Sequence, residues 1–404
     1  MPALGRVRLC LLSASIASLL AGGVAADLTP RERLGKLLFF DESLSAKGNQ
    51  SCAACHDPKA GWVGGNERIN KGGSVYEASI AGRFGDRKPP SAAYATVAPN
   101  FRLIDASGEF LGGNFWDGRA TGEKLGNAAA DQAIGPFLNP LEQALPDAGA
   151  LVSKVCTGSY AALFKEVWGA SACAEPEKAY GFIGLSIAAY EGSSEVNQFS
   201  AKYDAVLAGS AALTDEEALG LQLFIGKGRC AECHPTRGEG GTPAVFTDFR
   251  FHNIGVPRNP ANPFYQNAAA NPKGAAWIDG GLGEFLQTEP AHARHAQKNM
   301  GKHRVPTLRN VDLRPAPDFV KAYGHNGYFK SLQEIVHFYN TRDVLPACGG
   351  ATQRAGVDCW PRPEVEANLN RKQLGKLGLS DAEERAIVAF LSTLSDGYVR
   401  RGAD

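Results

Sequence analysis

This sequence has no excess of positive charge, and beyond its N-terminal stretch it has no long apolar segment. Its 404 residues include 42 Lys and Arg against 42 Asp and Glu, so the formal net charge is zero. Binding to nucleic acid relies on surplus positive charge, and this balance gives no support to a nucleic-acid partner. After residue 26, no apolar run reaches the roughly 20 residues that a membrane-spanning helix needs. The hydrophobic fraction of 44% predicts a globular protein instead, and the length suits two domains.

The strongly apolar stretch that does occur lies at the N-terminus and predicts a signal peptide over residues 1–26. Its basic start, apolar core and small-residue cleavage site are supplied in turn by Arg6 and Arg8, by Leu11 to Leu20, and by Val24 to Ala26. Cys10 lies inside this leader rather than at its end, so we expect no lipid anchor. The mature protein is therefore expected in the periplasm.

Nine cysteines stand in the chain, and export changes how they are interpreted. Structural disulfides persist in oxidising compartments. Four cysteines lie outside both the leader and the paired motifs described next, and the members of each couple are close in sequence. We therefore expect the disulfides Cys156–Cys173 and Cys348–Cys359. Four free buried thiols are the alternative.

The other four cysteines belong to two copies of the pattern C-x-x-C-H, at Cys52–His56 and Cys230–His234. This is the attachment signature of c-type haem, in which two thiols form thioethers and the histidine ligates the iron. A redox pair or a zinc half-site is the alternative for one copy, but two zinc half-sites would leave both histidines unexplained. We expect two covalently bound haem c groups, held by Cys52, Cys55 and His56 and by Cys230, Cys233 and His234.

Each haem motif follows a similar stretch of sequence. Leu34–Phe39 precedes the first motif and Leu219–Phe224 precedes the second. Each stretch lies in a predicted helix that begins with a capping box, Thr29–Glu32 in one case and Thr214–Glu217 in the other. We therefore expect a mainly α protein with two cytochrome c-type haem domains in tandem, related by duplication.

The predicted domains are residues 27–205 and 206–404, with the boundary inside 200–213. A further capping box at Ser380 predicts the final helix. Residues 238–300 are rich in Gly, Pro and Asn and show little periodicity. Such a long irregular segment is usually functional or mobile.

Several ordered motifs carry a resemblance to a known family. They are Phe115–Arg119, Gln132–Pro136, Asn139–Glu142, Val305–Asn310 and His325–Gly327. Together with the haem motifs they resemble the bacterial di-haem cytochrome c peroxidase and MauG superfamily, over essentially the whole mature chain.

The resemblance implies roles for three residues. Trp116 would carry electrons between the haems, and Gln132 and Glu142 would line the peroxide side of the N-terminal haem. Cleavage of peroxide needs a base that takes a proton from one oxygen and returns it to the leaving oxygen, which a glutamate can do. Spacing alone would make Glu142 a solvated acid and Trp116 a core aromatic residue.

Methionine is scarce, and this separates two branches of the family. Peroxidases of the family usually give the C-terminal haem a methionine ligand, but Met300 is the one methionine of the mature chain and precedes the relevant motif. The matching helix, predicted from a capping box at Ser331 and Glu334, places Leu332, Ile335, Val336 and Tyr339 on one face. As MauG-type members use tyrosine there, we expect Tyr339 to ligate the iron. A buried tyrosine with a hydrogen-bonded hydroxyl is the alternative.

No histidine occurs between His56 and His234. Family members that need reductive activation block the N-terminal iron with a histidine, and Ile80 stands at that position here. We therefore expect this iron to be open. Family members also often bind calcium, but Lys88 and Ala322 occupy the aligned positions, so calcium stays an open question.

The sequence thus predicts a periplasmic, MauG-like di-haem peroxidase without a membrane span. Hydrogen peroxide would react at the N-terminal haem to form a high-valent di-haem state. That state would oxidise a partner protein, at a residue such as Trp or Tyr, by long-range electron transfer. One alternative is a cytochrome c peroxidase that reduces hydrogen peroxide to water with electrons from a small redox protein. The other is a non-enzymatic electron-transfer cytochrome.

Overall fold

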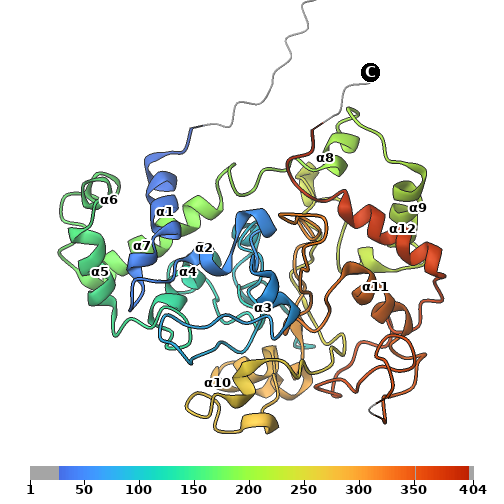
Figure 1. Ribbon diagram of the computed structural model, residues 1–404. Helices are drawn as coiled ribbons and strands as arrows, with labels where there is room; N and C mark the ends of the chain where they lie inside the picture. Colours follow the sequence, from blue (N-terminus) through green and yellow to red (C-terminus); the bar gives the residue numbers. More distant parts are fainter. Residues whose placement is uncertain (1–26, 351, 400–404) are drawn as a thin grey trace, which may run out of the picture.

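The protein is mainly helical in the computed structural model, which describes residues 27–350 and 352–399 (Figure 1). Within these ranges, twelve α-helices and four short strands are joined by long irregular segments. The predicted mainly α class is confirmed. Among the described residues, no helix is long and apolar enough to cross a bilayer. The predicted signal peptide, with Cys10, lies outside the described residues.

The elements follow one another along the chain with wide spacing. The α-helices are α1 (Pro30–Phe40), α2 (Cys52–Cys55), α3 (Glu67–Lys71), α4 (Ala128–Leu138), α5 (Ala148–Thr157), α6 (Ala161–Trp168), α7 (Pro176–Glu191), α8 (Lys202–Leu207), α9 (Asp215–Ile225), α10 (Leu282–Thr288), α11 (Leu332–Thr341) and α12 (Asp381–Ser392). The strands form two antiparallel pairs, β1 (Arg102–Leu103) with β2 (Phe110–Leu111), and β3 (Phe251–His252) with β4 (His303–Arg304).

In the N-terminal half, α1 crosses α7 at close range (Figure 1). The crossing depends on Gly35, where a Cβ atom would lie 1.9 Å from the carbonyl oxygen of Ser186 and 2.9 Å from the Cβ of Tyr190. Glycine is required because it lets two backbones touch. Helices α4, α5 and α6 pack around this pair and enclose one apolar core.

The C-terminal half contains the same kind of crossing, between α9 and α12 (Figure 1). A Cβ atom at Gly220 would lie 1.9 Å from the carbonyl oxygen of Ala386 and 2.8 Å from the Cβ of Phe390. Helix α11 packs against α12, and the three helices share a second apolar core. The two halves therefore repeat one helix crossing with the same register.

A third, smaller core joins the halves. Phe101 and Phe110, from the segment containing β1 and β2, pack with Phe251 of β3 and with Leu282 and Leu286 of α10. The irregular segment 238–300 supplies β3, α10 and several turns of 3₁₀-helix to this region. Its lack of periodicity reflects short elements that pack against the N-terminal half.

Most of the predicted local features are confirmed. Both disulfides are present, Cys156–Cys173 and Cys348–Cys359. The capping boxes at the starts of α1, α9 and α12 are formed in full.

Of the two hydrogen bonds of the capping box predicted at Ser331, one is formed and the other is wrong. The Ser331 hydroxyl accepts the Glu334 N–H, but the Glu334 carboxylate accepts the N–H of Lys330, at 2.6 Å, instead of that of Ser331. The predicted domain boundary at 205/206 falls inside α8, whose Tyr203 packs into the C-terminal core.

Candidate active site

The first C-x-x-C-H motif lies on α2 and opens into a cavity of the N-terminal half. Cys52, Cys55 and His56 all line this N-terminal cavity. The Nδ1 atom of His56 lies 3.2 Å from the carbonyl oxygen of Trp62. Burial lowers the pKa of His56 to about 4, although this hydrogen bond opposes the change. The ring is therefore neutral, with Nε2 left for another partner.

The second motif repeats this arrangement in the C-terminal half. Cys230, Cys233 and His234 line a C-terminal cavity, and the Nδ1 atom of His234 lies 2.6 Å from the carbonyl oxygen of Phe246. Burial lowers the pKa of His234 to about 4. None of the four motif cysteines forms a disulfide.

Both cavities fit a covalently attached haem. Each offers two thiols, a neutral imidazole whose Nδ1 is already hydrogen-bonded to a carbonyl group, and largely apolar walls. A haem-ligating histidine needs this arrangement, because the bond at one ring nitrogen fixes the tautomer and leaves the other for the metal.

Gln132 and Glu142 both line the N-terminal cavity with His56. Gln132 lies on α4, and Glu142 lies in the turn that follows this helix. Burial raises the pKa of the Glu142 carboxyl, while the charge of Arg119 and a hydrogen bond from Asn139 act in the opposite direction. The turn thus holds a proton-accepting group beside the predicted peroxide pocket.

Tyr339 lines the C-terminal cavity from α11. Leu332, Ile335 and Val336 of the same helix line an adjoining pocket that shares Tyr339 and His234 with this cavity, so the predicted inward face is formed. Within the described residues the Tyr339 hydroxyl makes no hydrogen bond. Burial raises the pKa of Tyr339. The alternative of a hydrogen-bonded core tyrosine therefore lacks its partner.

Two residues that bear on the ligand assignment lie elsewhere. Met300 lies beside Gly280 and Gly283, near the start of α10, and is not among the residues that line the C-terminal cavity. Ile80 is not among the residues that line the N-terminal cavity.

Trp116 forms a wall shared by both cavities. It lines the C-terminal cavity with His234 and Tyr339, and it also lines the extension of the N-terminal cavity that contains His56 and Glu142. Its side chain is only 8% exposed, and its indole Nε1 donates to the carbonyl oxygen of Lys88 at 2.8 Å.

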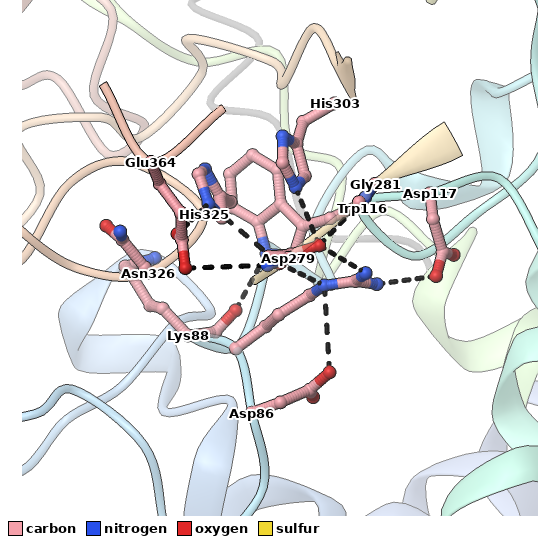
Figure 2. A network of polar contacts seen from close by, with 12 residues as sticks. Asp86, Lys88, Trp116, Asp117, Asp279, Gly281, His303, His325, Asn326 and Glu364 are labelled. Atoms are coloured by element: carbon pink, nitrogen blue, oxygen red, sulfur yellow. Dashed lines mark hydrogen bonds and ion pairs between the residues drawn. The ribbon is translucent and has the colours of Figure 1, made fainter. Parts of the chain in front are cut away.

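A buried polar network surrounds Trp116, and sequence reasoning missed most of it (Figure 2). Arg87 donates to both oxygens of Asp279, at 2.7 Å each, and to Asp117 at 2.5 Å. The rings of His303 and His325 stack at 3.6 Å between centroids, and Nε2 of His303 lies 3.2 Å from Asp279. Arg87 and Asp279 are 192 positions apart, so no local pattern announces the pair.

Two buried lysines lie near this network. Lys88 donates to the carbonyl oxygen of Pro89 at 3.0 Å, and Lys321 donates to the carbonyl oxygens of Asn310 and Leu313. Burial lowers the pKa of Lys88 to about 8, and burial followed by the charge of Lys88 holds the pKa of Lys321 well below its usual range. Lys88 was noted from the sequence, whereas Lys321 was not.

Comparisons with known proteins find di-haem peroxidases, in agreement with two cavities that each fit a haem. The family model described as di-haem cytochrome c peroxidase matches residues 29–212. The methylamine utilization protein MauG of Paracoccus denitrificans is 35% identical over 93% of this chain and 92% of its own length. The cytochrome-c peroxidase IdrP1 of Denitromonas iodatirespirans is 28% identical over 90% of this chain and 80% of its own. Among solved structures, the di-haem peroxidase BthA of Burkholderia thailandensis aligns with a TM-score of 0.75, at 30% identity, over 93% of this chain and 90% of that one.

Proposed function

Because this chain belongs to the di-haem cytochrome c peroxidase and MauG family, and is therefore a haem-dependent peroxidase, we propose that it works in the manner of MauG. In this proposal hydrogen peroxide reacts in the N-terminal cavity, and the oxidising equivalents are used to oxidise a partner protein at a distance. The partner residue is an oxidisable side chain such as Trp or Tyr. Two c-type haems, held by the two C-x-x-C-H motifs, would supply the redox chemistry when bound.

The observation that carries this proposal is the environment of Tyr339. Tyr339 lines the same cavity as His234, and its hydroxyl makes no hydrogen bond to the described residues, while Met300 is not among the residues that line that cavity. A phenolate ligand stabilises ferric iron and lowers its reduction potential, whereas methionine raises it. A tyrosine ligand therefore favours a haem that becomes oxidised during turnover. It disfavours a haem that only passes electrons from a donor protein to the N-terminal haem.

The residues of the N-terminal cavity are suited to peroxide. Glu142 would take a proton from one peroxide oxygen and return it to the leaving oxygen, which departs as water. The amide of Gln132 would orient the peroxide by hydrogen bonding. General acid–base assistance of this kind is typically worth about 10²–10⁴-fold in rate.

Trp116 is suited to carry electrons between the two sites, because it borders both cavities. Its hydrogen bond to the Lys88 carbonyl holds the indole in place and favours partial loss of the N–H proton when the ring is oxidised. His325, whose ring centroid lies 6.4 Å from that of Trp116, extends the contact toward Asp279.

Three further proposals concern the whole chain. The repeated crossing at Gly35 and Gly220 supports two haem domains related by duplication. The export pattern and the two disulfides support a periplasmic location. The ammonium group of Lys88, whose pKa is about 8, opposes calcium near Ala322, because buried positive charge repels a cation.

A second candidate function is peroxide reduction with electrons from a small redox protein. The similarity to a relative named cytochrome-c peroxidase favours it. Reduced small c-type cytochrome, supplied in excess with peroxide, separates the two candidates. We expect slow cytochrome oxidation by the wild-type protein and faster oxidation by Tyr339→Met. A wild-type rate equal to that of a Tyr339→Met variant with both haems intact would contradict the MauG-type proposal.

A further inference from the structure

Glu191 is a buried acid that lines the N-terminal cavity and takes no part in the peroxide reaction proposed above. It is the last residue of α7 and only 3% exposed. It lines the same cavity as Cys52, Gln132 and Glu142. Its Oε2 atom is buried without a hydrogen-bond partner in the described residues. A buried polar atom without a partner destabilises the fold, so this carboxyl calls for an explanation.

The C-terminal half shows that the fold does not need an acid here. The crossing at Gly35 pairs it with Ser186 and Tyr190, and the crossing at Gly220 pairs it with Ala386 and Phe390. In this register Glu191 of α7 corresponds to Leu391 of α12. Leu391 lines the pocket that adjoins the C-terminal cavity and contains Cys230 and His234, just as Glu191 lines the N-terminal cavity with Cys52 and His56. Leucine therefore suffices where no peroxide is expected, and the acid is confined to the cavity where it is expected.

The surroundings keep the Glu191 carboxyl neutral. Burial raises its pKa to about 8, with no charged partner to oppose the change. Three charged side chains on the helices that pack against α7 have their own partners. Lys36 of α1 pairs with Glu195, Asp131 of α4 accepts the N–H of Leu125 in the segment before that helix, and Lys154 of α5 donates to the carbonyl oxygen of Ser43. Once the cysteines and histidine of the cavity hold haem, Glu142 is the other titratable group that lines it beside Glu191, and the charged groups of its extension are Asp86, Arg87, Lys88 and Arg119.

The chemistry of peroxide reduction leaves a need for such a proton. Reduction of one hydrogen peroxide to two waters consumes two electrons and two protons. The transfer assigned to Glu142 moves a proton from one peroxide oxygen to the other, so it releases the first water and adds no proton. The two protons of the second water must come from elsewhere, at the stage when electrons arrive from the oxidised partner.

We propose that Glu191 is the proton store of the peroxide pocket and supplies one of these two protons when electrons return, while the other proton comes from solvent water. Glu191 is left as a carboxylate and then regains a proton from solvent. Glu142 and Glu191 thereby divide the work, since one moves a proton within peroxide and the other contributes a new one. The inference rests on the proposed peroxide reaction in the N-terminal cavity, and it adds a residue to that site.

Infrared difference spectra of the haem-loaded protein test the resting state of Glu191 without reference to activity. We expect a carboxylic-acid C=O band at pH 7 that shifts in D₂O and is missing in Glu191→Gln and in Glu191→Leu. The leucine variant copies Leu391, so it should fold with both haem spectra intact. A spectrum in which neither variant removes a carboxylic-acid band would overturn the proposal.

Single-turnover kinetics test the role. After one equivalent of hydrogen peroxide, excess ferrocyanide returns the protein to its resting spectrum. In Glu191→Gln we expect the first reaction to change less than about twofold and the return to slow by about 10²-fold, within the range of acid catalysis. The wild-type return should slow above pH 8, where Glu191 loses its proton, and the variant should lose that pH dependence.

An unchanged return rate and pH profile in Glu191→Gln would overturn the inference while leaving the proposed function intact. Absence of any peroxide reaction at the N-terminal haem of the wild-type protein would overturn the proposed function itself. The two failures are therefore distinguishable.

Discussion

The indole Nε1 of Trp116 donates a 2.8 Å hydrogen bond to the backbone carbonyl of Lys88. This bond fixes an oxidisable ring at the wall between the two haem cavities. Because the carbonyl group belongs to the backbone, the acceptor survives any substitution at Lys88. A substitution at Trp116 therefore removes the donor of this bond and leaves the acceptor in place.

Trp116→Phe should separate the peroxide reaction from the sharing of oxidising equivalents. Phenylalanine keeps an aromatic ring but is harder to oxidise and has no N–H for the Lys88 carbonyl. In rapid-mixing spectra with stoichiometric peroxide, the N-terminal haem should react at nearly the wild-type rate while the C-terminal haem stays unchanged. Trp168→Phe, at a ring stacked on Phe182 away from both cavities, is the matched control. A variant that blocks the first reaction as well would refute this role.

Glu142→Gln should slow the first step instead. Glutamine retains size and hydrogen bonding but cannot accept the proton, so the reaction with peroxide should fall by about 10²–10⁴-fold. Both haem spectra at rest should be nearly unchanged. Glu123→Gln, at an exposed position, should leave the rate as it is. An unaltered rate in Glu142→Gln would remove this residue from the mechanism.

The two disulfides should contribute similar stability but affect different haems. Replacing both cysteines of either pair by serine should lower the free energy of unfolding by about 2–3 kcal/mol, because the closed loops are of similar length. The 348–359 loop is tied to α11 through Trp360, whose indole N–H donates to Thr341 at 3.0 Å. Only its removal should perturb the spectrum of the C-terminal haem. Urea titrations and visible spectra of both double variants check this.

The Arg87–Asp279 pair should make stability depend on acidic pH. Burial alone would raise the pKa of Asp279, but the charge of Arg87, followed by that of His303, holds it well below its usual range. The contribution is therefore fully present above the unfolded pKa of about 4 and is lost as pH falls toward the folded value. Asp279→Asn should lower the free energy of unfolding at pH 7 by about 1.5–3 kcal/mol, the usual weight of a hydrogen bond to a charged group, because Arg87 keeps its buried ion pair with Asp117.

Denaturant titrations between pH 7 and pH 3 measure both effects, and the Asn variant should show less loss on acidification. Removing an exposed partner such as Lys178, which pairs with Glu175 at the surface, should change stability by less than about 1 kcal/mol. Equal effects of the two substitutions would show that burial of the Arg87 pair has no special weight.

Features encoded within a few residues could be predicted from the sequence. The two haem motifs, both disulfides and the inward face of α11 each depend on spacing along one segment. The capping box at Ser331 failed because a neighbouring N–H, that of Lys330, captured the Glu334 carboxylate. Such competition between adjacent donors leaves no trace in a four-residue pattern.

Features assembled from distant segments could not be predicted. Asp279, His303 and His325 meet because the irregular segment 238–300 folds back onto the N-terminal half, and no periodicity marks where it turns. Glu191 sits at the end of an apolar helix, where its register against Gly35 decides whether it faces solvent or the cavity. That register becomes visible only when the two halves are compared in space.

The axial ligand of the C-terminal haem is the point on which the MauG-type account depends most. Electron paramagnetic resonance of the ferric protein measures it directly, because it reports the spin state of each haem. The account predicts one high-spin and one low-spin haem, with Tyr339→Phe changing only the low-spin signal. A low-spin signal that survives Tyr339→Phe but disappears in Met300→Ala would contradict it.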